Sequence, residues 1–332
     1  MKWVSNYLYR SWYGSSTSGV FLAPLGVLYS FLRSARNLLY DCGILKEHHF
    51  PVPVIVVGNI TAGGAGKTPL VITLANELRN RGYHPGVVSR GYGASGPYPA
   101  AVEPTSDPGM VGDEAVLTAR RTGVPMVVDP DRVNAVATLL KSQTIDVVLS
   151  DDGLQHRRLG RYLEVAVIDG EREFGNRKLV PAGPLRDPVT RLKTVDLVVR
   201  NGGAPQNDEF AMTCLLGDAV NVLTGERRNL ESFSDSEVKA VAGVGNPGRF
   251  FRNLRSAGLR IETYVFPDHH VYTEKDLRHY SNHTVLMTEK DALKCEKFAG
   301  KDWWWVDLCV GLGSDFTEQI IYTLEKFRYY ES

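Results

Sequence analysis

One stretch of the chain, residues 52–70, constrains the fold more than any other. It reads VPVIVVGNITAGGAGKTPL, in which an apolar run at residues 54–57 stops at a glycine. A loop of small residues follows, and a Gly-Lys-Thr triplet at residues 66–68 leads into a helical pattern that opens with Pro69. Proline fits the first helical turn, where a missing N–H costs little. A strand, a glycine-rich loop and a helix N-terminus in this order are the context of a phosphate-binding loop.

The residue types of this loop predict how a polyphosphate is held. The glycines let backbone N–H groups turn inward, the helix N-terminus adds partial positive charge and Lys67 adds a full one. The Thr68 hydroxyl is a Mg²⁺ ligand in such loops. The strict pattern has glycine where this chain has Thr61, so an ordinary strand-to-helix turn is the alternative. The predicted nucleotide-binding residues are Thr61, Ala62, Gly63, Gly64, Ala65, Gly66, Lys67 and Thr68.

The overall composition is that of an ordinary globular protein. The chain has 332 residues, 43% of them apolar, which is enough for two domains with sizeable cores. Lys+Arg and Asp+Glu are equal at 38 each, and this balance argues against a general nucleic-acid binder. The four cysteines are scattered with no C-x-x-C spacing. They predict a reducing compartment, with neither a disulfide framework nor a zinc site.

The first 40 residues differ from the rest in charge, because they contain basic but no acidic residues. They also hold several tryptophans and tyrosines and an apolar segment, residues 20–32, that is shorter than the ~20 residues needed to span a bilayer. Together these features predict a helix that lies on or dips into an anionic membrane face. The alternatives are a helix packed on the main domain and a secretory signal peptide. The late apolar segment and the lack of a convincing small-residue cleavage site count against the signal peptide.

Short apolar runs alternate with helical patterns through the middle of the chain. After the loop, strands are expected at residues 85–89, 125–128, 145–149, 164–168 and 195–199, with helices between several of them. This alternation predicts an α/β fold of the P-loop NTPase-like type, with a doubly wound, mainly parallel sheet.

A glycine-rich stretch at residues 201–205 is expected to be a linker, and the pattern that follows predicts a second, smaller α/β domain. Extended pieces before residue 235 are expected to form a hairpin, and the last strand and helix are expected at residues 303–307 and 316–329. The predicted parts are a basic and aromatic membrane-associating arm (1–40), a P-loop kinase domain (41–205) and a smaller C-terminal domain (206–332).

Polar residues follow several of the expected strands, and such strand ends line the ligand crevice of open α/β sheets. Arg90 follows the strand at 85–89, and Asp151 and Asp152 follow the strand at 145–149. An apolar strand that ends in aspartate is typical of the Mg²⁺ side of a phosphate-loop site. A simple Asp-Gly turn is the alternative interpretation of Asp152.

Two further positions are candidates for proton transfer. Asp113 stands at the start of an expected helix, where it acts either as a cap or as a carboxylate that accepts a proton from a substrate hydroxyl. His269 and His270 follow an expected strand, and one of them can pair with a carboxylate across the domain cleft. Arg186 lies in a proline-rich stretch, residues 179–188, that predicts a rigid loop.

Taken together, the motifs resemble those of a known family. They are the loop at residues 59–69, RGYG (90–93), GDE (112–114), DDGLQH (151–156), PAGPLRDP (181–188), GNP (245–247), FPDHH (266–270) and TEKD (288–291). In this order, and over nearly the whole chain, they resemble the tetraacyldisaccharide 4′-kinases of lipid A biosynthesis. DDGLQH and PAGPLR are the most specific pieces. The threonine at position 61 is shared by that family.

The resemblance implies a function and a set of roles. It implies ATP- and Mg²⁺-dependent phosphorylation of the 4′-hydroxyl of an acylated glucosamine disaccharide 1-phosphate, which forms lipid IVA at the cytoplasmic face of the Gram-negative inner membrane. Asp113 is then the base, assisted by His269 in preference to His270. The other implied roles are phosphate binding by Lys67 and the loop amides, Mg²⁺ binding by Thr68 with Asp151 or Asp152, and positive charge from Arg90 or Arg186.

Two other classes of protein remain open at this point. A membrane-recruited nucleotide-switch ATPase often has a loop that begins Lys-Gly-Gly, which the GGAGKT run resembles. Ala62 stands where such switches carry their lysine, and this disfavours them. A non-catalytic nucleotide-binding scaffold is the third possibility. Transfer of label from ATP to the disaccharide lipid would distinguish the kinase from both.

Overall fold

The computed structural model describes residues 11–14, 21–206 and 208–331. Its centre is one mixed sheet with the strand order β11-β10-β12-β13-β8-β7-β6-β1-β5-β2-β4-β3, and β9 pairs with β8. Neighbouring strands run parallel except at β3–β4, β8–β9 and β8–β13. The predicted mainly parallel α/β sheet is therefore confirmed.

The strands have the following bounds: β1 Val54–Gly58, β2 Pro85–Ser89, β3 Ala100–Ala101, β4 Met126–Val128, β5 Val147–Asp151, β6 Leu163–Asp169, β7 Leu197–Asn201, β8 Glu209–Asn221, β9 Arg227–Arg228, β10 Val238–Ala242, β11 Ile261–Val265, β12 Val285–Thr288 and β13 Trp303–Leu312.

The P-loop half of the molecule comprises β1–β7 with the helices on their two faces. On one face, α3 (Lys67–Asn80), α5 (Asp113–Thr122) and α10 (Ser314–Glu331) share a single core with the strands. On the other face, α6 (Arg132–Ser142) packs over the strands. The first helix after the loop buries Leu70, Leu74 and Leu78, because residues four apart lie on the same helix face. This is the doubly wound arrangement that the sequence predicts.

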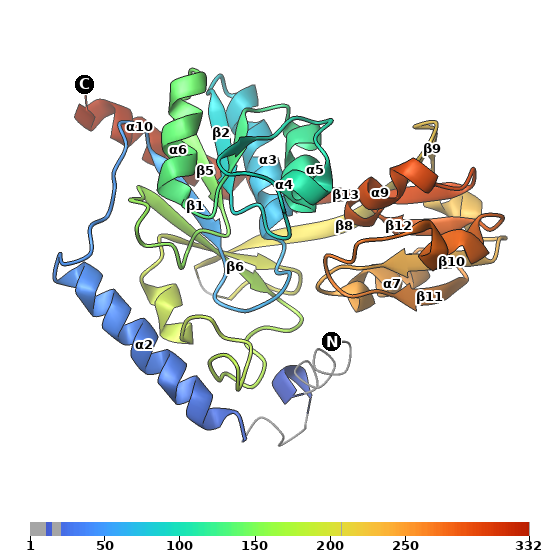
Figure 1. Cartoon of the computed structure of the whole chain (residues 1–332), viewed down its shortest axis with the longest axis horizontal. Coiled ribbons are helices and arrows are strands. Elements are labelled where there is room, and N and C mark those ends of the chain that lie inside the picture. The colour runs from blue at the N-terminus through green and yellow to red at the C-terminus, as the bar shows by residue number, and fades with distance from the viewer. Residues whose placement is uncertain (1–10, 15–20, 207, 332) are drawn as a thin grey trace.

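Two long strands, β8 and β13, join this half to the other half of the sheet, as Figure 1 shows. The first four residues of β8 pair in parallel with β7, and residues 212–221 pair antiparallel with β13. The sequence predicts only short extended pieces here, and this prediction underestimates the length of β8. Gly217 and Asp218 interrupt the run of strand-forming residues, so the local pattern understates a strand that tertiary pairing completes. The expected hairpin is the pairing of β8 with β9.

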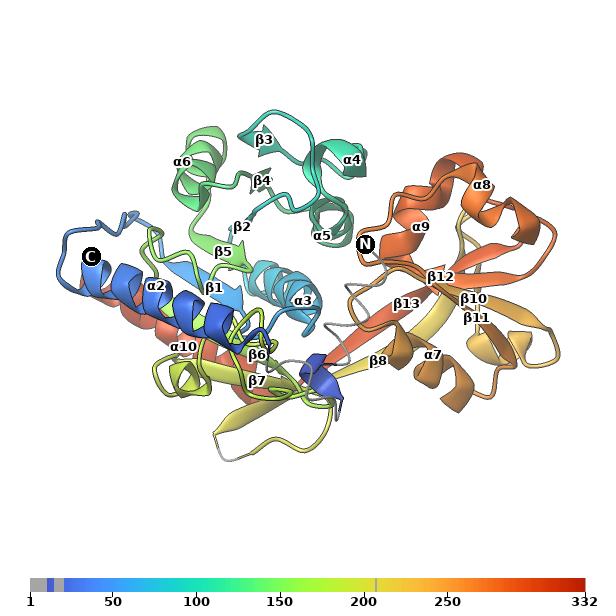
Figure 2. The same cartoon turned by 60° about the horizontal axis from the view of Figure 1, so that its bottom comes forward.

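The distal half comprises β10, β11, β12 and the adjoining ends of β8 and β13, with helices on both faces. α7 (Pro247–Ser256) covers one face, and α8 (Glu274–Leu277) and α9 (Glu289–Cys295) cover the other. Figure 2 shows these helices on opposite sides of the strands. Their placement brings α9 into contact with α5 of the P-loop half.

The last helix, α10, packs on the P-loop half and not on the distal half. Phe316, Ile320 and Leu324 are buried in the same core as α3. The sequence places this helix at the end of the C-terminal domain, because chain order alone suggests it. The antiparallel return of β13 along β8 instead delivers the chain back to the P-loop half. The boundaries 41–205 and 206–332 stay a prediction.

Near the N-terminus, α2 (Ala23–Asp41) packs one face on the loop at residues 179–188, as the lower left of Figure 1 shows. Gly26 is buried against Ala182, the Tyr29 hydroxyl donates to the Arg186 carbonyl at 2.9 Å, and Arg33 Nε donates to Asp187 Oδ1 at 2.7 Å. The opposite face is apolar and exposed: Leu25, Val27, Leu28, Phe31, Leu32, Leu38 and Leu39.

Within the described ranges, no helix combines the length and the apolar character that crossing a membrane requires. Residues 1–10, which carry Lys2, Arg10, Trp3, Tyr7 and Tyr9 of the predicted arm, lie outside the described residues. The membrane contact of the arm therefore stays a prediction.

Candidate active site

The predicted phosphate-binding loop lies between β1 and α3 and has the backbone that such a loop needs. Gly63 and Gly66 both have φ of 100°, a conformation that residues with a Cβ atom rarely adopt. Thr61 is buried, forms a β-bridge with Leu185, and accepts a 3.2 Å hydrogen bond from the Asn59 side chain. A glycine at position 61 would lose the side-chain oxygen that anchors the loop entrance. The departure from the strict motif thus has a structural reason.

Asn201, the last residue of β7, holds the far side of this loop. Its side-chain amide donates to the Ala65 carbonyl at 2.9 Å. A Cβ atom on Gly66 would lie 2.3 Å from the same amide nitrogen, so only glycine allows this close approach. The sequence predicts a linker at residues 201–205, and that interpretation misses the role of Asn201. The signal that could have revealed it is its position at the carboxyl end of a parallel strand.

Lys67, Asp152 and Arg186 come together beside the loop. Lys67 Nζ donates to Asn59 Oδ1 at 3.1 Å and lies 3.5 Å from Asp152 Oδ1. Arg186 donates to both carboxylate oxygens of Asp152, at 3.0 and 2.7 Å. Burial alone would raise the pKa of Asp152, but the charges of Lys67 and Arg186 outweigh it and lower that pKa. Asp152 has φ of 53°, a left-handed conformation that aims its side chain at these cations.

Thr68 and Asp151 form the other carboxylate contact of the site. Thr68 Oγ1 donates to Asp151 Oδ2 at 3.0 Å. Asp151 is the last residue of β5 and is almost fully buried, and its Oδ1 has no hydrogen-bond partner in the described part of the chain. Burial, together with the negative charge of Glu114, raises the pKa of Asp151. A buried carboxylate oxygen without a partner, next to a hydroxyl, is the kind of donor set that suits a hard divalent cation.

Asp113 and His269 pair across the two halves of the molecule. His269 Nδ1 lies 3.1 Å from Asp113 Oδ1 and 3.2 Å from Oδ2, and the Tyr92 ring packs on the imidazole with 4.6 Å between centroids. Asp113 is the first residue of α5, and Gly112, not Asp113, is the cap residue of that helix. His270 points elsewhere, with Nε2 3.4 Å from Asp276 Oδ2. The geometry therefore brings together the two residues that the resemblance pairs.

The pKa values of this pair follow from burial and neighbouring charge. Burial raises the pKa of Asp113, but the hydrogen bond with His269 and the charges of Lys290 and Lys294 lower it to about 2. Burial disfavours the imidazolium form of His269, but the hydrogen bond with Asp113 outweighs this and raises the His269 pKa. The carboxylate is therefore ionised, and the imidazole beside it holds a proton more readily than a free histidine.

Lys290 is a site residue that sequence reasoning did not single out. Its Nζ donates to Glu114 Oε1 at 3.0 Å and lies 3.3 Å from Asp268 Oδ1 and 3.8 Å from Asp113 Oδ2. The sequence predicts a cap-like helix start at residues 288–291, and Thr288 indeed caps α9 by accepting from the Asp291 amide. That cap aims the next turn of α9 at the Asp113–His269 pair. Only the meeting of the two halves reveals Lys290.

Arg90 is the one predicted catalytic residue that the structure leaves apart. It follows β2 and is exposed, and it makes no hydrogen bond or ion pair with any residue that the structure describes. As expected, Arg90 lies at the carboxyl end of a parallel strand, but its side chain does not reach Lys67, Asp152 or Asp113. Its role stays a prediction.

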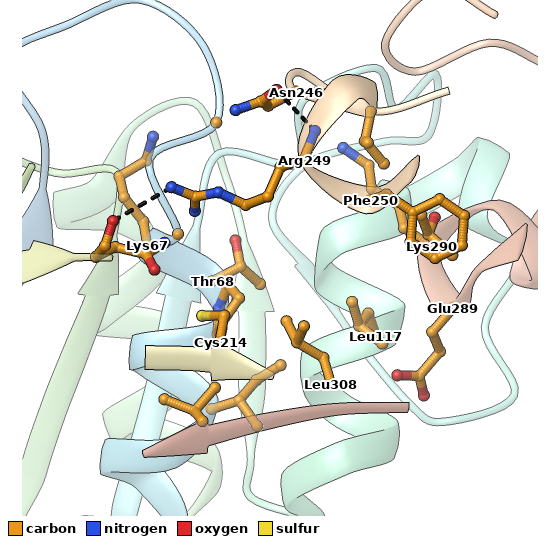
Figure 3. Close-up of a pocket in the computed structure, with 18 of the residues that line it drawn as sticks. Lys67, Thr68, Leu117, Cys214, Asn246, Arg249, Phe250, Glu289, Lys290 and Leu308 are labelled. Carbon is orange, nitrogen blue, oxygen red and sulfur yellow. Dashed lines mark hydrogen bonds between the residues drawn. The ribbon is translucent and has the colours of Figure 1, made fainter. Parts of the chain in front are cut away.

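A cavity of about 460 Å³ opens between the halves, next to the loop. In Figure 3, Lys67 and Thr68 lie at one end of it, and Phe250, Glu289 and Lys290 lie on the distal side. Part of its wall is apolar and comes from α3, α5, β8 and β13: Ile72, Leu117, Cys214, Leu216, Val306, Leu308 and Val310. A charged end and an apolar wall match the two ends of a nucleotide.

Comparison with known proteins agrees with this geometry. Residues 18–325 match the family model described as tetraacyldisaccharide-1-P 4′-kinase. A tetraacyldisaccharide 4′-kinase of Nitrosococcus oceani is 49% identical over 323 residues, which cover 97% of this chain and 95% of the relative. A protein of the same name from Shewanella frigidimarina is 44% identical over 325 residues, covering 97% and 96% of the two chains.

A solved structure is also similar along the whole chain. It is the "apo" form of LpxK from Aquifex aeolicus in complex with ATP, with a TM-score of 0.78 and 28% identity over 94% of this chain and 99% of that one. These matches favour the kinase over the nucleotide-switch ATPase and the scaffold. The chain therefore belongs to the tetraacyldisaccharide 4′-kinase family, the phosphotransferases of lipid A biosynthesis.

Proposed function

We propose that the chain binds ATP with its phosphates on residues 61–68 and its base against the apolar wall of the cavity. The observation that carries this proposal is the position of Lys67 and Thr68 at the charged end of that cavity. Lys67 then neutralises phosphate charge, and the inward N–H groups of the loop hold phosphate oxygens. The complex of the Aquifex aeolicus protein with ATP supports this assignment.

We also propose that Thr68 and Asp151 hold a Mg²⁺ ion. The unpartnered Asp151 Oδ1 and the neighbouring hydroxyl are oxygen ligands of the type that Mg²⁺ prefers. When bound with ATP, Mg²⁺ neutralises charge on the phosphate oxygens. Both oxygens of Asp152 accept hydrogen bonds from Arg186, so Asp152 orients that arginine in addition to any contact with the ion.

The Asp113–His269 pair is proposed to accept the proton of the attacking 4′-hydroxyl. The two side chains share one hydrogen bond and titrate as a unit, so the proton is assigned to the pair. Asp113, being ionised, orients the imidazole and stabilises its protonated form. Lys67 and Arg186 lie beside the phosphate end and supply the positive charge that phosphoryl transfer requires.

The acceptor is proposed to be an acylated glucosamine disaccharide 1-phosphate, reached from a membrane surface. The exposed apolar face of α2 supports this, because Leu28 and Phe31 are 53% and 68% exposed although the helix packs on the enzyme with its other face. Such a helix can lie at an interface with its apolar face among acyl chains. The curated relatives are bacterial. We propose peripheral attachment at the cytoplasmic face of the inner membrane.

The function is tested with γ-labelled ATP and the disaccharide lipid in mixed micelles. Wild-type protein is expected to place label on the lipid. Asp113→Asn should lower kcat by about 10²–10⁴-fold, the typical contribution of a general base, while the Kd for ATP changes little. Asp235→Asn, at an exposed site away from the cavity, is the matched control and should behave as wild type. Lipid-independent phosphate release with no labelled lipid would contradict the proposal, and an equal loss of ATP binding in Asp113→Asn would remove the base assignment.

A further inference from the structure

The helix α9 presents two lysines, one turn apart, to the proposed base. Lys290 Nζ lies 3.8 Å and Lys294 Nζ lies 3.6 Å from the same oxygen, Asp113 Oδ2. Lys290 borders the cavity next to the phosphate loop. Lys294 lies on the other side of Asp113, in a second hollow that Tyr92 and His269 also line. The carboxylate from the P-loop half therefore sits between two cations from the distal half.

Lys294 is buried between a carboxylate of its own helix, Asp291, and Asp113 of the P-loop half. Its side chain is 10% exposed, and its Nζ is buried without a hydrogen-bond partner in the described residues. The same nitrogen lies 3.2 Å from Asp291 Oδ1 and 5.1 Å from the centre of the Tyr272 ring. A buried ammonium group costs free energy unless nearby negative charge compensates it. The charge of Lys294 compensates the fully buried Asp291 within the helix, and the same ammonium group also reaches Asp113 across the two halves.

The second carboxylate next to Lys294 is already occupied by other donors. Asp291 accepts hydrogen bonds from the Gly243 amide at 2.9 Å, the Thr288 hydroxyl at 2.6 Å and the Tyr272 hydroxyl at 3.1 Å. It is fully buried and fixes the position of the ammonium group from the distal side. Lys294 therefore lies between two buried carboxylates, at 3.2 Å from Asp291 Oδ1 and 3.6 Å from Asp113 Oδ2, and its charge acts on both.

Lys290 is in a different electrostatic position, because three carboxylates surround it. Besides Asp113, it contacts Glu114 at 3.0 Å and Asp268 at 3.3 Å. Its charge is therefore shared among them. Lys294 has only Asp113 and Asp291 within ion-pair distance among the residues that the structure describes. Of the two cations on α9, Lys294 is the one whose charge is least divided.

We propose that Lys294 is a positioning residue that keeps Asp113 ionised and aligned with His269. The inference rests on the proposed role of Asp113 and His269 as the proton acceptor. The charged groups that face Asp113 are His269, Lys290 and Lys294, and the carboxylates of Glu114 and Asp268 lie next to Lys290. A positive charge this close favours the carboxylate over the protonated acid. By the same Coulomb effect, it lowers the proton affinity of the Asp113–His269 pair as a whole.

The test compares Lys294→Met with Lys294→Arg in the full chain, with the lipid assay run from pH 5 to pH 9. Removal of the charge should move the acidic limb of the kcat/KM profile to higher pH by about one unit. It should lower kcat near pH 7 by about tenfold, and the Kd for ATP should stay within about twofold of wild type. Lys294→Arg keeps the charge and should retain the wild-type limb. Lys297→Met is the matched control, because Lys297 is 88% exposed and pairs with Asp107.

A double-mutant cycle separates this inference from the base assignment. If Lys294 acts through Asp113, Lys294→Met should have little further effect in the Asp113→Asn background. If Lys294→Met lowers kcat by the same factor in wild type and in Asp113→Asn, the inference about Lys294 is overturned, whereas the assignment of Asp113 as the base is unaffected. Full activity in Asp113→Asn alone would overturn the base assignment and, with it, the role of Lys294.

Two further results bear on the charge itself. A Lys294→Met profile that superimposes on wild type would show that the ammonium group does not act on the pair. An identical shift in Lys294→Met and Lys294→Arg would assign the effect to packing and would also overturn the inference. If Lys294→Met melts below the assay temperature, Lys294→Gln replaces it in the comparison with Lys294→Arg, because the glutamine amide is neutral but retains polar contacts in the same space.

Discussion

Thr68 Oγ1 donates a 3.0 Å hydrogen bond to Asp151 Oδ2, and this contact joins the first turn of α3 to the last residue of β5. β1 and β5 are neighbours in the sheet, with Val57 beside Asp151, so the two motifs meet at one sheet edge. The other carboxylate oxygen, Asp151 Oδ1, is buried and has no hydrogen-bond partner among the described residues.

The first prediction concerns this pair and Mg²⁺. Asp151→Asn and Thr68→Val should each raise the Mg²⁺ concentration for half-maximal activity by about tenfold or more, because each removes an oxygen that the ion would use. Thr68→Ser keeps the hydroxyl and serves as the matched control, with a Mg²⁺ requirement close to wild type. A lipid-labelling assay over a Mg²⁺ titration measures this. Unchanged midpoints in Asp151→Asn and Thr68→Val would exclude both residues as ligands.

The second prediction concerns stability and pH. The pKa of Asp113 falls from 3.8 to about 2 in the folded chain, so its contacts with His269, Lys290 and Lys294 together contribute about 2 kcal/mol that is present above pH 3.8 and is lost as pH falls to about 2. The pKa of His269 is raised above 6.5, so its contribution is present below pH 6.5 and is lost as pH rises through the raised value. Pairing therefore stabilises the fold most between about pH 4 and pH 6.5.

Urea unfolding of wild type and Asp113→Asn measures this difference. The gap between their unfolding midpoints should be widest inside that pH window and should narrow on both sides. The exposed Asp235→Asn variant should follow wild type at every pH. A gap that stays constant from pH 3 to pH 9 would show that the ionised pair does not stabilise the fold.

The third prediction concerns the apolar face of α2. Leu28→Glu combined with Phe31→Glu should weaken sedimentation with phosphatidylglycerol vesicles by about tenfold or more, because two large apolar side chains are removed from the interface. Both side chains are exposed, so the melting temperature should not change. Asn282→Glu adds a charge at an exposed site in the distal half and is the control. If wild type, the Leu28→Glu/Phe31→Glu variant and Asn282→Glu sediment equally with the vesicles, the apolar face of α2 does not contribute to membrane binding.

The fourth prediction concerns the link from α2 to the active site. Arg33 Nε donates to the buried Asp187, whose other oxygen accepts from Gln155 at 2.7 Å, and Arg186 is the preceding residue in the chain. Arg33→Met should destabilise the fold by about 1–2 kcal/mol, since it leaves a largely buried carboxylate without its cation. Activity should fall several-fold, because the loop that carries Arg186 loses its support.

The control for this link is Arg36→Met, since Arg36 is exposed and its side chain donates to the Gln155 carbonyl, at 3.0 Å, and not to a carboxylate. It should have a smaller effect on both stability and activity. Adding Asp187→Asn to Arg33→Met should recover part of the lost stability, because it removes the unpaired charge. A double variant less stable than Arg33→Met would contradict an electrostatic origin.

Local sequence was sufficient to predict the elements that carry the proposed phosphate site. Residues 54–57 form a strand because they are β-branched and buried on both faces, and the helix after the loop shows one leucine per turn. The strand before Asp151 and the turn at Asp152 also follow from local pattern. The motif order then identified the family, which the match over residues 18–325 confirms.

Tertiary structure decided the contacts that depend on residues far apart in the chain. Local pattern marks Asp113 and His269 as separate candidates and the family resemblance pairs their roles, but only the docking of the distal half on α5 sets them 3.1 Å apart. The same docking brings Lys294 to Asp113, and the return of β13 along β8 carries α10 back to α3. Sequence periodicity records which face of an element is buried but not which element covers it. The loop could therefore be predicted from residues 52–70 alone, whereas the arrangement of the cations and carboxylates around it could be seen only in the folded chain.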